Sequence, residues 1–149
     1  MHDVDESWGD VPAEWNELTS RVIGCAIEVH RHLGQGLLEK LYEAAFVHEL
    51  RSTGLRLEQQ RVERVPYKDI VLPEQVFDVV VENLIVVELK AVAAVADAHL
   101  AQLVSYLRVA RLPLGLLINF HVPRLADGVY RRINSSAIPQ RSPRPLRSI

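Results

Sequence analysis

The 149-residue chain has the composition of an ordinary globular protein, with 48% hydrophobic residues, 24% charged residues and a formal net charge of −2. This length favours one domain, and the weak net charge excludes a protein that holds nucleic acid through one global basic field. No apolar run approaches the roughly 20 residues that span a bilayer, and the acidic first residues are not a secretory signal. We therefore expect a cytoplasmic protein without a membrane partner.

Two helices and an extended segment are expected in the first half of the chain. Apolar residues recur with helical spacing over 14–33, and the glycines within 34–36 end this helix. A second helix is predicted from residue 37 to about 53. Residues 55–72 alternate in polarity, with a turn expected at Pro66, so they predict an outer strand or a hairpin.

The second half of the chain predicts a buried sheet and a third helix. Short β-branched or apolar runs are typical of strands covered on both faces, and they occupy 76–81, 84–90 and 114–119, with a last edge strand at 128–133. Residues 82–83 form a turn and 97–111 a helix. The fold class is therefore α/β, a central mixed β-sheet flanked by helices.

Composition also divides the chain into three parts. Residues 1–13 are expected to be a flexible acidic leader, and 14–133 the folded domain. Residues 134–149 carry prolines, serines and arginines, and this composition predicts a disordered tail.

Charged residues interrupt the most apolar strands. Glu88 and Lys90 share one face of their strand, because strand side chains alternate. If the chain turns around residues 82–84, Asp78 falls opposite or nearly opposite Glu88, and cross-strand neighbours lie about 5 Å apart at Cβ. Ionised groups in a buried strand are costly unless they are paired or bind a metal.

Two interpretations of these charges follow. Asp78 and Glu88 can hold one hard cation such as Mg²⁺ or Mn²⁺, with the backbone carbonyl of Leu89 as a further ligand. Such an ion activates water and stabilises charge on a phosphate, while Lys90 orients or deprotonates the water or neutralises the oxyanion. In the alternative, Glu88 and Lys90 form a structural ion pair at a strand end and Asp78 is an edge residue.

Two helices carry further polar candidates. His99, Gln102 and Tyr106 lie on one face of the third helix. For Gln102 and Tyr106 a functional role is favoured, whereas His99 alone is better explained as part of a solvated face. Glu39 begins the second helix, where the helix dipole favours an acid, and it could equally add a third carboxylate to the metal.

In combination these motifs resemble the GxxExxY proteins, a small group within the PD-(D/E)xK nuclease superfamily. The resemblance starts at Gly36-x-x-Glu39-x-x-Tyr42 and covers about residues 18 to 133. It continues through Asp78 and then through residues 86–92, 99–107 and 116–123. The chain departs from the superfamily pattern at Phe77, where the name expects proline, and after the Lys-Ala-Val stretch, where alanines replace an acid.

The resemblance implies roles for these residues. Asp78 and Glu88 would bind metal, Lys90 would be catalytic, and Glu39 would join the metal site as it does in the RecB-like branch. Gln102 and Tyr106 match the Gln-x-x-x-Tyr element that supports the active site and substrate in that branch.

The function that follows is a metal-dependent nuclease, with DNA favoured over RNA as substrate and a role in repair or defence. The alternative is a catalytically silent module of the same fold that binds nucleic acid or a partner protein. A homodimer is expected, because one small domain offers little surface for gripping a duplex.

Overall fold

Five strands form the central sheet of the structure, a computed structural model that describes residues 11–139. The sheet order is β1-β4-β5-β6-β7, with β5 and β6 parallel and the other neighbours antiparallel. These strands are β1 (Leu57–Glu63), β4 (Gln75–Val81), β5 (Ile85–Lys90), β6 (Leu114–Asn119) and β7 (Val129–Ile133). The predicted mixed sheet is therefore confirmed.

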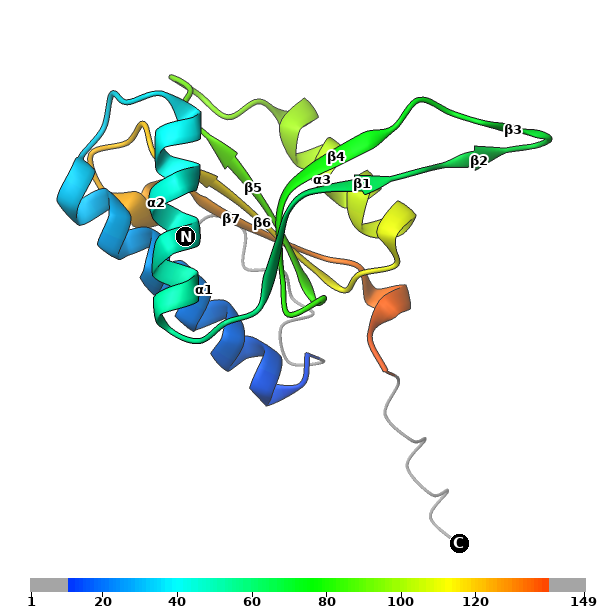
Figure 1. Cartoon of the computed structure of the whole chain (residues 1–149), viewed down its shortest axis with the longest axis horizontal. Helices are drawn as coiled ribbons and strands as arrows, with labels where there is room; N and C mark the ends of the chain where they lie inside the picture. The colour runs from blue at the N-terminus through cyan, green and yellow to red at the C-terminus, as the bar shows by residue number, and fades with distance from the viewer. Residues whose placement is uncertain (1–10, 140–149) are drawn as a thin grey trace, which may run out of the picture.

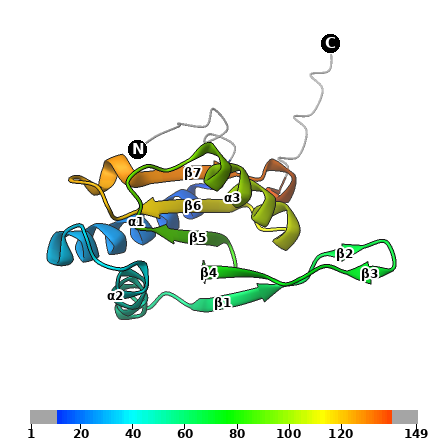
Figure 2. The same cartoon turned by 90° about the horizontal axis from the view of Figure 1, so that it is seen from above.

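Three helices cover the two faces of this sheet (Figures 1 and 2). They are α1 (Ala13–Leu33), α2 (Glu39–Ser52) and α3 (Asp97–Ala110). The larger core joins α1 and α2 to one face, and the smaller core joins α3 to the other face. No helix within the described residues is long and apolar enough to cross a membrane.

The smaller core depends on a close approach between α3 and β6. Gly115 lies in β6 directly beneath α3, and a Cβ atom there would stand 2.9 Å from Leu103 Cδ1. A side chain at this position would therefore have to displace the Leu103 and Leu107 side chains that pack there. Because β5, α3 and β6 form a parallel crossover unit, the chain leaves the end of β5 that carries the polar residues and enters α3.

A two-stranded arm projects from the sheet (Figure 1). It continues β1 and β4 and consists of β2 (Pro66–Tyr67) and β3 (Ile70–Val71). The hairpin expected within 55–72 is thus present, but the turn expected at Pro66 is wrong. Pro66 pairs with Val71, and the chain reverses at residues 68–69. The first strand of the arm lies at a sheet edge, where proline is tolerated because no ladder N–H is required of it.

The ordered domain is longer than the predicted range 14–133. Asn134 and Ile138 are buried, and a short 3₁₀ helix, η3 (Ser135–Ala137), lies between them. Residues 134–139 therefore do not belong to a disordered tail, because the Ile138 side chain joins the larger core. Val11 is also buried, so the leader ends earlier than expected. The rest of the expected leader and tail lies outside the described residues.

Candidate active site

The candidate site lies where β4 and β5 separate. A tight turn over residues 82–84 joins the two strands: the Leu84 N–H donates to the Val81 carbonyl at 2.9 Å, and Glu82 and Asn83 have left-handed φ values of 52° and 51°. The ladder then pairs Val81 with Ile85, Val80 with Val86, and Val79 with Val87. It stops before Asp78 and Glu88, so β4 continues with β1 alone while β5 continues toward Lys90 beside β6.

At this fork, side-chain carboxylates replace the backbone carbonyls of the ladder as hydrogen-bond acceptors. The Leu89 N–H donates to Asp78 Oδ2 at 3.0 Å, and the Asp78 N–H donates to Glu88 Oε1 at 3.3 Å. Each carboxylate thus accepts a backbone N–H that a ladder carbonyl would otherwise have bonded. This reciprocal arrangement satisfies both backbone donors and fixes the two carboxylates against each other.

The strand geometry also changes at Asp78. Phe77 packs in the smaller core with Val80, whereas Val79 and Val81 pack in the larger core on the opposite face. Strict alternation would place Phe77 with Val79 and Val81. The backbone is therefore twisted at Asp78, and Gln60, which would oppose it on β1, has a φ of 50°.

Glu88 is the most strongly perturbed acid of the fork. The residue is 9% exposed, and burial is the largest cause that raises its pKa to about 8, followed by the charge of Asp78. Lys90 acts in the opposite direction and lowers this pKa. Two carboxyl groups that share a desolvated site hold a proton near neutral pH, so this pair is poised to exchange the proton for a cation.

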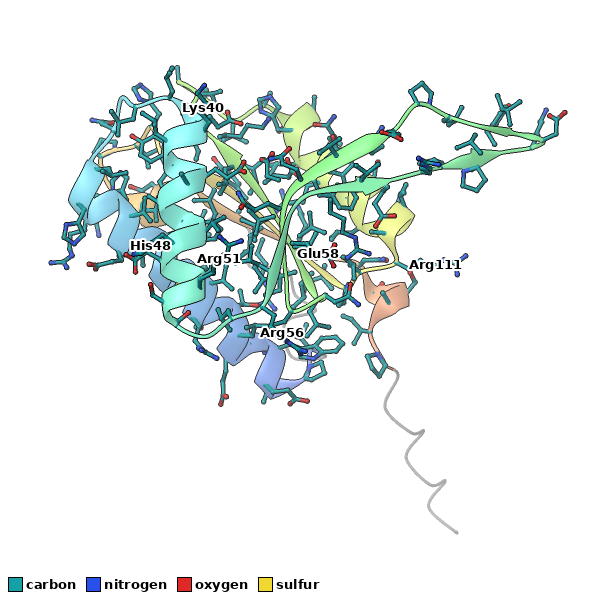
Figure 3. All side chains as sticks on the ribbon, viewed as in Figure 1. Lys40, His48, Arg51, Arg56, Glu58 and Arg111 are labelled. Carbon is teal, nitrogen blue, oxygen red and sulfur yellow. The ribbon has the colours of Figure 1, made fainter. Side chains whose placement is uncertain are left out.

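Glu39 reaches the same fork from α2. Its carboxylate lies near the backbone N–H of Ala91, the residue that follows β5, and this N–H lowers its pKa. Although the residue is exposed as a whole, partial desolvation of the carboxylate raises its pKa, Lys90 lowers it, and Asp78 raises it again. Lys40, the next residue of α2, marks this end of the helix in Figure 3.

The Gly36-x-x-Glu39-x-x-Tyr42 motif divides into structural and site residues. The Tyr42 hydroxyl donates to the Gly34 carbonyl at 2.6 Å and accepts from the Leu37 N–H at 3.1 Å. Its ring is buried and stacks on Phe120 at 4.5 Å between centroids. Gly36 has a φ of 103°, which the turn before α2 requires. Tyr42 therefore anchors the turn that presents Glu39.

The three polar residues predicted on one face of α3 differ in their relation to the fork. Tyr106 packs against Phe77 at 5.0 Å between ring centroids, and its pKa is raised first by burial and then by the charges of Glu88 and Asp78. Gln102 lies one turn away and is exposed, and within residues 11–139 its amide makes no hydrogen bond. His99 Nδ1 accepts from the Ala96 N–H at 3.1 Å, so it closes the start of the helix.

The ion pair of the structural interpretation is not present within residues 11–139. Among the described residues, none of the ion pairs includes Glu88 or Lys90. Asp78 lies in β4, an inner strand of the sheet, at the point where β5 has separated and only β1 continues beside it. The polar residues at this end of the sheet therefore do not neutralise one another by direct pairing.

The chemistry of the donors suits a hard cation. Asp78 and Glu88 supply carboxylate oxygens, which Mg²⁺ and Mn²⁺ prefer. Because the N–H and C=O of one strand residue point to the same side, the Leu89 carbonyl faces the fork as its N–H does. Within residues 11–139, no group of three or more His, Cys, Asp or Glu side chains is arranged to hold a metal. The core of the site is thus two carboxylates and not three.

Sequence reasoning missed one residue that shapes the site. Asn119 is buried at the end of β6, next to Lys90 in the parallel register. Its Oδ1 accepts from the Val92 and His121 N–H groups at 3.0 and 3.2 Å, and its Nδ2 donates to the Val92 carbonyl at 2.9 Å. Asn119 therefore holds the chain that leaves β5. The available signal was an amide that ends an otherwise apolar run.

Comparison with known protein families agrees with this fold. Residues 16–133 match the family model of the PD-(D/E)XK nuclease superfamily. No curated protein and no solved structure is significantly similar to the chain. The family match covers most of the sequence, and the chain therefore belongs to the PD-(D/E)XK nuclease superfamily.

Proposed function

We propose that the protein is a metal-dependent nuclease that hydrolyses phosphodiester bonds of DNA at the β4–β5 fork. The observation that carries this proposal is the hydrogen-bonded pair of Asp78 and Glu88, with Lys90 beside it and no ion pair to neutralise them among the described residues. Perturbed acids of this kind cluster at functional sites.

Each side chain of the fork has a distinct role in this proposal. Asp78, Glu88 and the Leu89 carbonyl would hold Mg²⁺ or Mn²⁺, with Glu39 as the nearby third acid. A bound ion of this kind supplies an activated water and stabilises charge on the phosphate. Lys90 donates to the attacking water or to a phosphate oxygen, which places a positive charge where negative charge develops.

Tyr106 and Gln102 support the substrate. The Tyr106 hydroxyl lies within electrostatic reach of both carboxylates, and the ring is held by Phe77. Gln102 is exposed on the same helix face, where its amide is available to a nucleotide. These positions support assignment to the RecB-like branch and to the GxxExxY group, as does the way Tyr42 presents Glu39.

We also propose that the substrate is DNA and not RNA and that the protein acts in the cytoplasm. Two copies of the chain are expected to act together, because one domain of this size covers little of a duplex. Sedimentation velocity of the full chain, alone and with a DNA duplex, measures the assembly. A single monomeric species under both conditions would exclude the homodimer.

A nuclease assay with matched variants tests the central proposal. Labelled single-stranded DNA, double-stranded DNA and RNA are incubated with the full chain in Mg²⁺, in Mn²⁺ and in EDTA. We expect cleavage that requires the metal and that falls roughly 10²- to 10⁴-fold in Lys90→Ala and in Glu88→Gln. The control is Glu82→Gln, the same change at the closed end of the hairpin, where Glu82 pairs with Arg56. This control should cleave as the wild type does.

The outcomes separate the two candidate functions. Cleavage that survives both fork substitutions in a folded protein would contradict the site. Nucleic acid binding that is unchanged by EDTA, in a wild type that never cleaves, would indicate the silent module instead.

A further inference from the structure

A second polar surface lies at the far end of α3, away from the fork. It is a cleft of about 360 Å³ between the end of this helix and η3, lined by Arg108, Arg111, Asn134, Ser136 and Ala137. Both arginines are exposed, and within residues 11–139 neither forms an ion pair. Figure 3 shows the Arg111 side chain extending outward from the body near η3.

Hydrogen bonds hold the walls of this cleft together. Asn134 is buried, and its Nδ2 donates to the Leu107 and Leu112 carbonyls at 3.3 and 3.2 Å. Its backbone N–H donates to the Pro113 carbonyl at 2.8 Å, and its Oδ1 accepts from the Ser136 hydroxyl at 2.8 Å. These bonds satisfy carbonyls at the end of α3, so the two arginines project from a fixed base.

Charge along the chain is strongly divided, and the cleft lies in the basic part. Residues 98–149 carry eight arginines and a single acid, Asp127, whereas residues 1–97 carry the other eighteen acids and nine lysines or arginines. The near-zero total therefore conceals a basic C-terminal part. Three of its arginines follow residue 139 in the sequence.

Several arginines elsewhere in the described structure are paired with acids. Arg31 pairs with Glu28 at 2.9 Å, Arg56 with Glu82 at 3.1 Å, and Arg64 with Glu74 at 3.1 Å. Within residues 11–139, Arg108 and Arg111 have no such partner, and no acid occurs between Asp97 and Asp127 in the sequence. Guanidinium groups presented in a fixed cleft suit phosphate, which they bind through forked, charge-assisted hydrogen bonds.

We infer that this cleft binds the phosphodiester backbone of a nucleic acid strand, outside the fork where the reaction is proposed. The inference deepens the proposed function and rests on it for the identity of the strand as substrate. Arg111 follows Tyr106 by five residues, about 8 Å along a helix axis. One strand that contacts Tyr106 at the fork is therefore long enough to reach the arginines.

Equilibrium binding tests this cleft without relying on catalysis. A fluorescent 20-nucleotide DNA, single- or double-stranded, is titrated with the full chain in EDTA over a series of salt concentrations. We expect Arg108→Ala with Arg111→Ala to weaken binding roughly tenfold and to reduce the salt slope by about 2. The matched control is Arg31→Ala with Arg56→Ala, which changes the net charge equally but removes paired arginines. It should change affinity less than twofold.

Two results would overturn the inference. The first is an equal loss of affinity in both double variants, which would indicate net charge and not this cleft. The second is inorganic phosphate binding that needs Arg108 and Arg111, measured by calorimetry, together with DNA affinity that does not. The cleft would then take a small free anion.

The experiments distinguish failure of the binding inference from failure of the nuclease proposal. DNA binding that needs both arginines, in a protein that never cleaves DNA, supports binding at the cleft and contradicts the nuclease proposal. Cleavage by a protein whose DNA affinity does not depend on the two arginines supports the nuclease proposal and overturns binding at the cleft.

Discussion

The β4–β5 hairpin consists of two unlike halves, and the contrast between them explains where chemistry can occur. In the closed half, from Val79–Val87 to the turn, every paired side chain is apolar and buried, and the ladder is regular. In the open half, Asp78 and Glu88 accept the backbone N–H groups themselves. The same two strands thus provide a rigid base and a polar fork.

This difference teaches that the carboxylates are part of the fold as well as candidates for the reaction. An open ladder leaves buried N–H groups that need acceptors. Carboxylates from β4 and β5 supply them, so Asp78 and Glu88 meet at the open end of the hairpin as a consequence. The two halves should therefore respond differently to substitution, with stability governed by the closed half and activity by the fork.

The largest expected effect on stability is in the closed half. Ile85 is fully buried in the larger core, so Ile85→Ala should lower the free energy of unfolding by about 2–5 kcal/mol, through lost transfer energy and the cavity that remains. Urea denaturation measures this change. Lys90→Ala, in the open half, is the matched substitution and should change stability far less.

The cleavage rate should show the reverse order, with a much larger loss in Lys90→Ala than in Ile85→Ala. At a temperature where both variants are folded, Ile85→Ala should keep its cleavage rate per folded molecule, while Lys90→Ala should lose it. A rate loss in Ile85→Ala as large as that in Lys90→Ala would mean that the two halves do not act separately.

A smaller effect concerns the proton on Glu88. In the metal-free folded protein its pKa is about 8, against an ordinary value of 4.5 that applies to the unfolded chain. Between these values the folded state binds more protons, so the free energy of unfolding falls as pH rises from about 4.5 to 8. Glu88→Gln removes this dependence. In EDTA it should match the wild type near pH 5 and exceed it by roughly a few kcal/mol near pH 9.

The comparison of the two proteins isolates Glu88 from other titrating groups. Urea denaturation at several pH values gives both stability curves. If the curves of wild type and Glu88→Gln stay parallel across this range, then the acid does not carry a raised pKa in the folded state. Glu82→Gln, which changes a half-buried acid at the closed end, should not reproduce the effect.

Local signals in the sequence predicted the elements well. The strand over 114–119 and the helix starting at residue 97 were placed correctly, because buried apolar runs and helical spacing are properties of neighbouring residues. The meeting of Asp78 and Glu88 followed from the length of the turn between them. These features depend on a few residues in one segment.

Features that depend on distant partners were not predictable. The opening of the ladder arises because β4 follows β1 away from β5, and no residue near Asp78 signals it. The burial of Ile138 depends on a core formed by segments far away in the chain, so the composition of residues 134–139 indicated a tail instead. The cleft at Arg108 was hidden for a similar reason, since it needs Asn134 and η3 beside α3.

The smallest expected effect distinguishes the structural role of Tyr42 from the site role of Glu39 within the Gly36-x-x-Glu39-x-x-Tyr42 motif. Tyr42→Phe removes a hydroxyl that bonds Gly34 and Leu37 but keeps the ring stacked on Phe120. We expect a loss of about 1–2 kcal/mol in the free energy of unfolding, because two hydrogen bonds of the turn are lost. Cleavage by the folded variant should remain close to the wild-type rate.

Glu39→Gln is the matched change three residues earlier, at the fork. It should leave stability nearly unchanged and reduce the cleavage rate, because its carboxylate lies near Lys90 and Asp78. Thermal melts and rates on both variants measure the two quantities. If Tyr42→Phe loses activity without losing stability, then the tyrosine acts on the reaction directly and its hydroxyl does more than anchor the turn. If both variants lose only stability, the fork excludes Glu39 and consists of Asp78, Glu88 and Lys90.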